Sequence, residues 1–131
     1  MTPDDFRRLA LSFPSAAEGE HMGHPDFRAP PPAARPARPS AGKAGGARGP
    51  IFASLSGGED GEARGMIKLP LDRQEALTAA HPDIFSPCAG AWGRQGCTNV
   101  NLPAARMAIL RPAMAAAYRR AAGAQGAARG R

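Results

Sequence analysis

Apolar positions recur with the period of a helix at the start of the chain. They stand three and four residues apart, at Phe6, Leu9, Ala10 and Phe13. This spacing predicts a helix with one apolar stripe against a core. Thr2 with Asp5 approximates a capping box, and Pro3 suits the first helical turn. Pro14 marks the end of this helix.

Strand-like segments follow the helix. Residues 15–25 are polar and predict a connection, and a short strand is expected at 26–28. The apolar residues at 51–55 predict a second strand. Its partner is expected at 64–69, across a glycine-rich turn at 56–61. These segments indicate a sheet of short strands.

A second helix is predicted after the strand at 64–69. Asp72 stands three residues before Glu75, which is the spacing of a reciprocal N-terminal cap. The helix is expected to continue to Ala80, because Pro82 disfavours helical backbone just before it. A loop at 83–90 follows.

The last part of the chain predicts one more strand and more helix. The strand is expected at 97–102, where alternation places Thr98, Val100 and Leu102 on one face and Cys97, Asn99 and Asn101 on the other. Pro103 and Pro112 each predict the start of a helical stretch. The apolar stripe of these stretches comprises Met107, Leu110, Met114 and Tyr118. Together the elements predict an α+β fold, with a small antiparallel sheet and helices packed on one face in a single compact domain.

Two stretches differ from the rest in composition. Residues 29–50 contain six prolines, seven alanines and four basic residues. Hairpin loops usually span about 2–5 residues, so this segment predicts a disordered insert at a hairpin tip. Residues 123–131 contain only Gly, Ala, Gln and Arg, and predict a flexible basic tail. The folded domain is therefore expected at 1–122, interrupted by the insert.

The positive charge of the chain is unevenly distributed. The formal net charge is +6, the insert carries four basic residues without an acid, and seven arginines but no acids follow Asp83. A basic surface is typical of a protein that binds a polyanion. Fifteen arginines against two lysines are also expected from the codon usage of a GC-rich genome. Charge alone leaves both explanations open.

The residues that could catalyse a reaction or bind a metal are not spaced along the chain as catalytic and metal sites require. His21, His24, Cys88 and Cys97 can be grouped as four ligands, but eight residues separate the two cysteines, and structural zinc sites place theirs two to four apart. The sequence shows neither an oriented nucleophile–base pair nor a phosphate-binding glycine loop. We therefore expect no catalysis, no metal and no cofactor.

The sequence also bears on the compartment. Two cysteines do not support a disulfide-built scaffold, and no apolar run reaches the roughly 20 residues of a membrane span. The N-terminus begins with acidic residues and lacks the basic-then-apolar pattern of a signal sequence. The expected location is the cytoplasm.

Blocks of sequence spread along the chain are shared with a known family. They are the opening helix, His-Pro-Asp-Phe-Arg at 24–28, Ile-Phe-Ala at 51–53, Met-Ile-Lys-Leu at 66–69, the block at 92–102 that begins Trp-Gly, and Tyr118. In these blocks the chain resembles the MmcQ/YjbR-like proteins, over nearly all of its length outside the insert and tail. The resemblance implies a compact α+β fold whose sheet is described as a double wing, and a presumed DNA-binding role without a reaction. The insert and Pro112 depart from the family's pattern.

Two functions are compatible with these observations. As a DNA-binding protein, the chain is expected to use Lys68, Arg94, Asn99 and Asn101. Arg and Lys suit phosphates, and Asn can pair with base edges. Such binding would be weak and salt-sensitive, because phosphate contacts release counterions.

The alternative is a small-ligand or protein-interaction module. Its polar pocket is expected near His24, Asp26, Arg28 and Trp92. Each residue also has a plain structural role. Residues 24–26 can simply fix the entry into the first strand, and the favoured role of Trp92 is filling the core.

Overall fold

The computed structural model describes four stretches of the chain, 1–21, 23–30, 49–57 and 63–127. Most of the insert predicted at 29–50 lies outside these residues, so its predicted disorder is not described. Most of the turn predicted at 56–61 and the end of the tail predicted at 123–131 also lie outside them.

The described residues fold into one antiparallel sheet with helices. Its six strands are β1 (Ala17–His21), β2 (His24–Arg28), β3 (Ile51–Gly57), β4 (Ala63–Lys68), β5 (Phe85–Pro87) and β6 (Cys97–Val100), in the spatial order β1-β2-β3-β4-β6-β5. The helices are α1 (Pro3–Leu11), α2 (Leu71–Ala80), α3 (Gly90–Arg94) and α4 (Met107–Ala127), with a short 3₁₀ helix η3 (Leu102–Ala104). The predicted α+β class and antiparallel sheet are confirmed.

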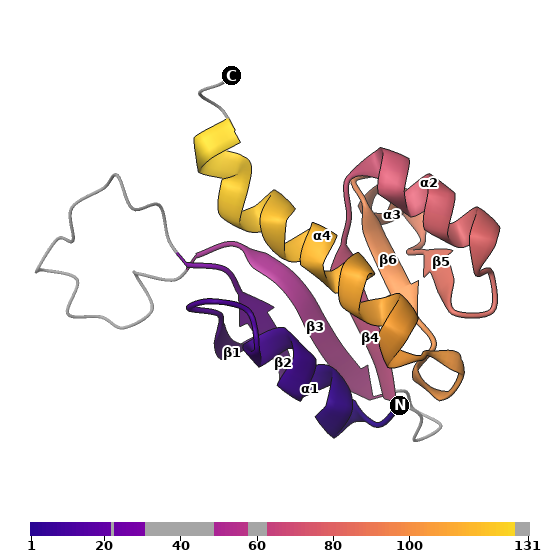
Figure 1. The fold of residues 1–131 in the computed structure, drawn as a ribbon, viewed down its shortest axis with the longest axis horizontal. Coiled ribbons are helices and arrows are strands. Elements are labelled where there is room, and N and C mark those ends of the chain that lie inside the picture. Colours follow the sequence, from indigo (N-terminus) through magenta and orange to yellow (C-terminus); the bar gives the residue numbers. More distant parts are fainter. Residues whose placement is uncertain (22, 31–48, 58–62, 128–131) are drawn as a thin grey trace, which may run out of the picture.

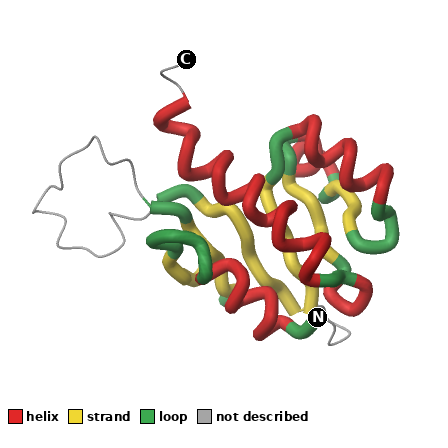
Figure 2. The backbone as a smooth tube through the Cα atoms, viewed as in Figure 1, coloured by secondary structure: helices red, strands yellow, loops and turns green. Residues whose placement is uncertain are grey.

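The long helices cover one face of the sheet. Both α1 and α4 pack on β3 and β4, and α2 packs beside β5 (Figure 1). Figure 2 shows the strands as a single layer crossed on one side by these helices. The one-turn helix α3 adjoins β6 and supplies residues to the other face. We call that other face the open face.

The core lies between the sheet and the helices. Its largest fully buried side chains include Phe6, Phe27, Phe52, Phe85, Ile67, Leu69, Ile84, Leu102, Leu110, Met114 and Val100. Gly65 of β4 lies under the ring of Phe6, and a Cβ placed on Gly65 would stand 2.5 Å from a ring carbon. Glycine at this position therefore lets α1 approach the sheet closely.

The first helix forms as its sequence predicts. The hydroxyl of Thr2 accepts from the Asp5 N–H at 3.1 Å, and the Thr2 N–H donates to the Asp5 carboxylate at 3.0 Å. This second bond is the main reason that the pKa of Asp5 lies below its usual value. Arg7 reaches Glu18 of β1 at 2.9 Å and ties the helix to the edge of the sheet.

The polar connection predicted at 15–25 is wrong, because this segment contains β1. Strands β1 and β2 form a hairpin in which Ala17 pairs with Arg28 and His21 with His24. Gly23 in the connecting turn has a φ of +81°, which glycine adopts without strain. Strand β1 carries polar residues because it is an edge strand, and charged side chains protect such an edge from further pairing.

The insert joins two neighbouring antiparallel strands, as its position predicts. Strands β2 and β3 are paired, with Asp26 opposite Ser54. The Ala29 N–H donates to the Pro50 carbonyl at 2.9 Å, so the chain leaves and re-enters the sheet at adjacent points.

The predicted cap of the second helix is wrong. Helix α2 begins at Leu71 with Pro70 as its N-cap residue, and no side chain caps it. The Pro70 carbonyl accepts from the N–H groups of Arg73 and Gln74, which places Asp72 inside the first turn. There the Asp72 carboxylate still interacts favourably with the positive end of the helix dipole.

The loop predicted at 83–90 is also wrong in part. It contains β5, which ends at Pro87, and an edge strand tolerates proline because one side of its backbone is unpaired. The predicted strand at 97–102 is shorter, since Leu102 already belongs to η3.

The last helix is continuous, so the prediction that Pro112 opens a separate helix is wrong. Pro112 lies inside α4 with its ring exposed, and Pro103 lies in η3. The helix runs past Gly123, where the tail was expected to begin. Within the described ranges, no helix is both long and apolar enough to cross a bilayer.

Candidate functional site

A row of polar and sulfur-containing side chains crosses the open face. Strand pairing places Asp26 beside Ser54, Ser54 beside Met66, Met66 beside Asn99, and Asn99 beside Ser86. Directly opposed residues on one face of an antiparallel sheet lie close enough for their side chains to interact. The row therefore brings five strands into one continuous surface.

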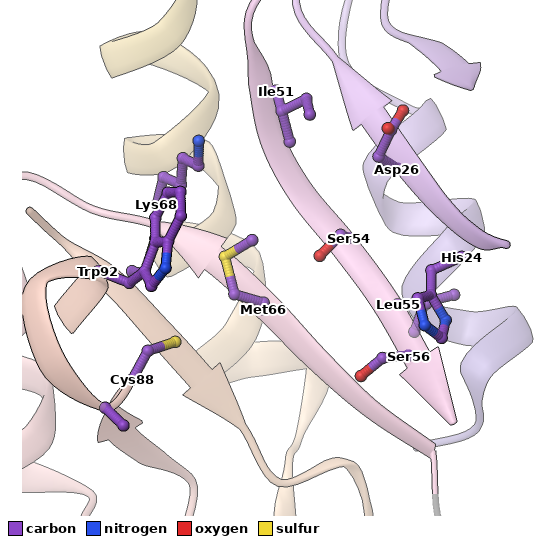
Figure 3. A pocket seen from close by; sticks show the side chains of 12 residues that line it. His24, Asp26, Ile51, Ser54, Leu55, Ser56, Met66, Lys68, Cys88 and Trp92 are labelled. Atoms are coloured by element: carbon purple, nitrogen blue, oxygen red, sulfur yellow. The ribbon is translucent and has the colours of Figure 1, made fainter. Parts of the chain in front are cut away.

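A pocket of about 530 Å³ lies over the part of this row that comprises Asp26, Ser54 and Met66. Figure 3 shows side chains from several elements around it. The residues that line it are His24, Asp26, Ile51, Ser54, Leu55, Ser56, Met66, Lys68, Cys88, Ala89, Trp92 and Cys97. Small-molecule sites commonly occupy roughly 300–1,000 Å³, so this pocket has the size of a ligand site.

Asp26 is the buried acid of the pocket. Only 1% of Asp26 is exposed, and the Arg28 guanidinium holds it with two contacts of 3.2 Å, from Nε to Oδ1 and from Nη2 to Oδ2. Arg28 also donates to the Gly49 carbonyl at 3.2 Å. Arg28 therefore positions Asp26 and balances its charge, while Arg28 itself is not among the lining residues.

Lys68 is the basic group of the pocket wall. It is half-buried on β4, in the pairing position opposite Cys97. Among the described residues, no carboxylate lies within ion-pair distance of its ammonium group. Lys68, Asp26 and Arg28, which pairs with Asp26 from behind the pocket, sum to one positive charge.

Trp92 forms the outer wall, and its predicted role as core filling is wrong. The residue is 63% exposed, while its neighbour Gly93 is buried. A Cβ on Gly93 would stand 2.0 Å from the carbonyl oxygen of Cys88, which follows β5, so only glycine allows α3 to approach the chain this closely here. That packing turns the indole of Trp92 away from the core and toward the pocket (Figure 3).

A buried amide fixes α3 in this orientation. The Nε2 of Gln74 donates to the carbonyls of Gly93 and Cys97, each at 3.0 Å, and to the Thr98 hydroxyl at 3.1 Å. Gln74 thus links α2, α3 and β6 behind the pocket.

Both cysteines line the pocket as free thiols. Cys88 donates from Sγ to the Asn99 Oδ1 at 3.4 Å. Burial, followed by the adjacent Cys97, raises the pKa of the Cys88 thiol to about 11. Cys88 is therefore a neutral thiol at neutral pH.

The residues predicted for a polar pocket largely meet. His24, Asp26 and Trp92 line the same cavity, and Arg28 holds Asp26 from beside it. His24 comes from β2 and Trp92 from α3, so elements distant in sequence contribute to the cavity.

Of the residues predicted for DNA contacts, Lys68 and Asn99 lie on the open face. Lys68 lines the pocket and Asn99 belongs to the open-face row. Arg94 ends α3 as an exposed residue. Asn101 lies beyond β6, where its Nδ2 donates to the Asp83 carbonyl at 3.1 Å.

The sequence reasoning missed several pocket residues. Ser54, Ser56 and Met66 alternate with core residues on β3 and β4, and that alternation was the available signal. Gln74 gave no signal, because a single polar residue in a short helix does not reveal its partners. In the described part of the chain, no three His, Cys, Asp or Glu side chains are grouped so that they could hold a metal ion.

Comparison with known proteins supports the fold. The sequence matches no protein-family model and no curated protein. The structure is similar to the crystal structure of Deinococcus radiodurans protein DR2400, a protein with a DUF419 domain. The TM-score is 0.64 and the identity 18%, and the match covers 89% of this chain and 75% of that chain. The DUF419 domain falls in the YjbR/MmcQ-like double-wing fold group, so the likeness in structure agrees with the resemblance in sequence at the level of the fold.

Proposed function

We propose that the protein binds a small organic anion in the open-face pocket. The observation that carries this proposal is a basic side chain without a counter-charge in a largely apolar cavity. Lys68 is half-buried there and has no carboxylate partner among the described residues. An ammonium group without an ion-pair partner can gain from an acidic group that reaches it, because charge-assisted hydrogen bonds are the strong ones.

The other lining residues define the body of the ligand. Trp92, Met66 and Ile51 offer apolar surface, which suits a flat or aromatic group. The hydroxyls of Ser54 and Ser56 can each donate and accept. We therefore expect a compact molecule with one acidic group, an apolar body and a few polar substituents.

Ligand binding can be tested directly with the full chain. Benzoate, indole-3-carboxylate and adenosine monophosphate serve as probes in a thermal-shift assay, because a ligand that binds only the folded state raises the unfolding midpoint. Trp92 is the only tryptophan, so its fluorescence reports the same binding event. We expect at least one probe to raise the midpoint and change this fluorescence.

A matched pair of variants locates the binding site. Lys68→Met keeps the aliphatic stem but removes the charge, and should weaken the binding of the positive probe about tenfold or more. Arg73→Met removes a charge from the exposed surface of α2 and should leave the affinity unchanged. Probes that bind neither chain, or that bind Lys68→Met as well as the unchanged protein, contradict the proposal.

DNA binding is the second candidate. It is supported by the placement of Arg64, Lys68 and Asn99 on the same open face, since Arg64 and Lys68 alternate with core residues along β4. A DNA duplex that lies across this face would bring its phosphates close to the two cations of β4. Such contacts are electrostatic and carry little sequence information.

Fluorescence anisotropy with a labelled duplex at several salt concentrations tests this candidate. If about five phosphates are neutralised, the logarithm of the affinity should fall with the logarithm of salt at a slope of roughly −4 to −5. Lys68→Met should reduce that slope by about one. Binding that is absent at low salt, or independent of salt, excludes this function without affecting the small-ligand proposal.

A further inference from the structure

Cys88 and Cys97 face each other across two neighbouring strands. Pro87 of β5 pairs with Thr98 of β6, so the next pair along this antiparallel ladder is Cys88 with Cys97. The Cys88 N–H donates to the Cys97 carbonyl at 2.9 Å, which confirms that the two residues are directly opposed. Both side chains line the pocket, so both lie on the same face of the sheet.

This placement matches the geometry of a disulfide. Directly opposed residues in antiparallel strands have Cα atoms about 4.5–5.5 Å apart. Disulfides join residues whose Cα atoms are about 4.4–6.8 Å apart. The two thiols are therefore within bonding reach without a rearrangement of the sheet, although both are free in this structure.

We propose that Cys88 and Cys97 form a reversible dithiol–disulfide pair that exchanges with low-molecular-weight disulfides. The Cys88 thiolate attacks one sulfur of the small disulfide, breaks its S–S bond and releases one thiol. The Cys97 thiolate then attacks the Cys88 sulfur of the mixed disulfide, forms the Cys88–Cys97 bond and releases the second thiol. Two electrons pass from the protein sulfurs to the small disulfide, and the two thiol protons end on the released thiols.

Accessibility sets the order of these steps. Cys88 is half-buried at the pocket wall, whereas Cys97 is only 5% exposed. An external disulfide therefore reaches Cys88 first. The second step needs no access from solvent, because Cys97 already stands opposite Cys88.

The first step is slow at neutral pH. The pKa of Cys88 is about 11, so only a small fraction is thiolate at pH 7, and this fraction rises about tenfold per pH unit below the pKa. The titratable groups that share the pocket with Cys88 are His24 and Asp26 of β2, Lys68 of β4 and Cys97 of β6. Exchange at the pair therefore accelerates with pH.

The cysteine pair is inferred from the strand register, so the proposal does not depend on ligand or DNA binding.

To test it, the reduced full chain is incubated with excess oxidised glutathione at about pH 8.5, and the remaining thiols are alkylated before mass spectrometry. We expect a monomer that is two hydrogens lighter and takes up no alkylating agent. Proteolysis should then yield one peptide pair joined through Cys88 and Cys97.

Two single variants separate this pair from general thiol oxidation. Cys97→Ser should stop at a stable glutathione adduct on Cys88, because the second attack is lost. Cys88→Ser should remain alkylatable after unfolding, because Cys97 is buried. The proposal is overturned if the unchanged chain stays a dithiol, accumulates glutathione adducts, or forms disulfides only between chains.

Discussion

Gln74 offers the sharpest test of how the pocket wall is built. Its Nε2 lies 3.0 Å from the carbonyl oxygens of Gly93 and Cys97 and 3.1 Å from the Thr98 hydroxyl. The residue is buried on α2, and the change Gln74→Leu removes both amide hydrogens while keeping a similar volume. We expect this variant to fold with reduced stability.

The loss of stability in Gln74→Leu can be estimated from the hydrogen bonds that its former acceptors keep. The Cys97 carbonyl still accepts from the Cys88 N–H at 2.9 Å, and the Gly93 carbonyl from the Gly96 N–H at 3.0 Å. No acceptor is orphaned, so the cost is that of two hydrogen bonds at about 1 kcal/mol each, or about 2 kcal/mol in all. Gln74→Glu should cost about 3–5 kcal/mol at neutral pH, because it buries a carboxylate against oxygen atoms.

Urea unfolding, followed by far-UV circular dichroism and Trp92 fluorescence, measures these losses. With a slope of about 2 kcal/mol per molar urea, Gln74→Leu should lower the midpoint by about 1 M at an unchanged slope. Gln74→Glu should recover part of its loss as the pH falls, because a protonated carboxyl can donate one hydrogen bond. Gln95→Leu, on the exposed end of α3, is the control and should stay within about 0.5 kcal/mol of the unchanged chain. A Gln74→Leu variant as stable as that control refutes the reasoning.

Three further perturbations probe the two faces of the sheet. Gly65→Ala should cost about 1–3 kcal/mol in urea unfolding, because its Cβ would stand 2.5 Å from the buried ring of Phe6. Arg28→Met should cost about 3 kcal/mol, because it leaves the buried Asp26 carboxylate without its paired charge. Stability should fall between about pH 9 and 11 as the Cys88 thiol titrates. The sign follows from its raised pKa of about 11 in the folded chain, against 9.0 for a free thiol, because the unfolded chain loses the proton first.

Each of these results has a control. Gly123→Ala, at a helical position with open space around it, should be neutral or stabilising. Adding Asp26→Asn to Arg28→Met should restore much of the lost stability, and no restoration would mean that the ion pair is not the cause. Cys88→Ser should show a flatter alkaline stability profile than the unchanged chain, and identical profiles would exclude Cys88 as the titrating group.

Much of the fold could be predicted because its helix and sheet signals are local. The apolar stripe of α1 and the strands β3 and β4 each carry a periodic pattern over several residues. Strand β1 escaped prediction because Glu18 and Glu20 alternate with Ala17 and Gly19, which leaves no large apolar residue, and β5 because three residues ending in proline carry no pattern. The continuity of α4 across Pro112 depends on the outward position of that ring, which tertiary packing decides.

Part of the candidate site could be predicted from residues that lie close together on one strand. The closeness of His24 and Asp26 in the sequence grouped them in advance, although the predicted strand began only at Asp26, whereas β2 begins at His24. The partnership of Cys88 with Cys97 was not visible, because it arises from the pairing of β5 with β6. The exposure of Trp92 was missed for a similar reason, since it depends on how Gly93 packs against the Cys88 carbonyl.

Binding and stability can be separated at Lys68, which makes the binding proposals testable on a folded chain. The helix face holds the buried aromatic and aliphatic core, where a single added methyl group on Gly65 meets Phe6. On the open face, Lys68 forms no ion pair within the described residues, so its removal breaks no salt bridge there. Lys68→Met should therefore leave the unfolding free energy within about 0.5 kcal/mol of the unchanged chain. A loss of ligand or DNA affinity in that variant then reports the removed contact itself, because the scaffold that holds the pocket is intact.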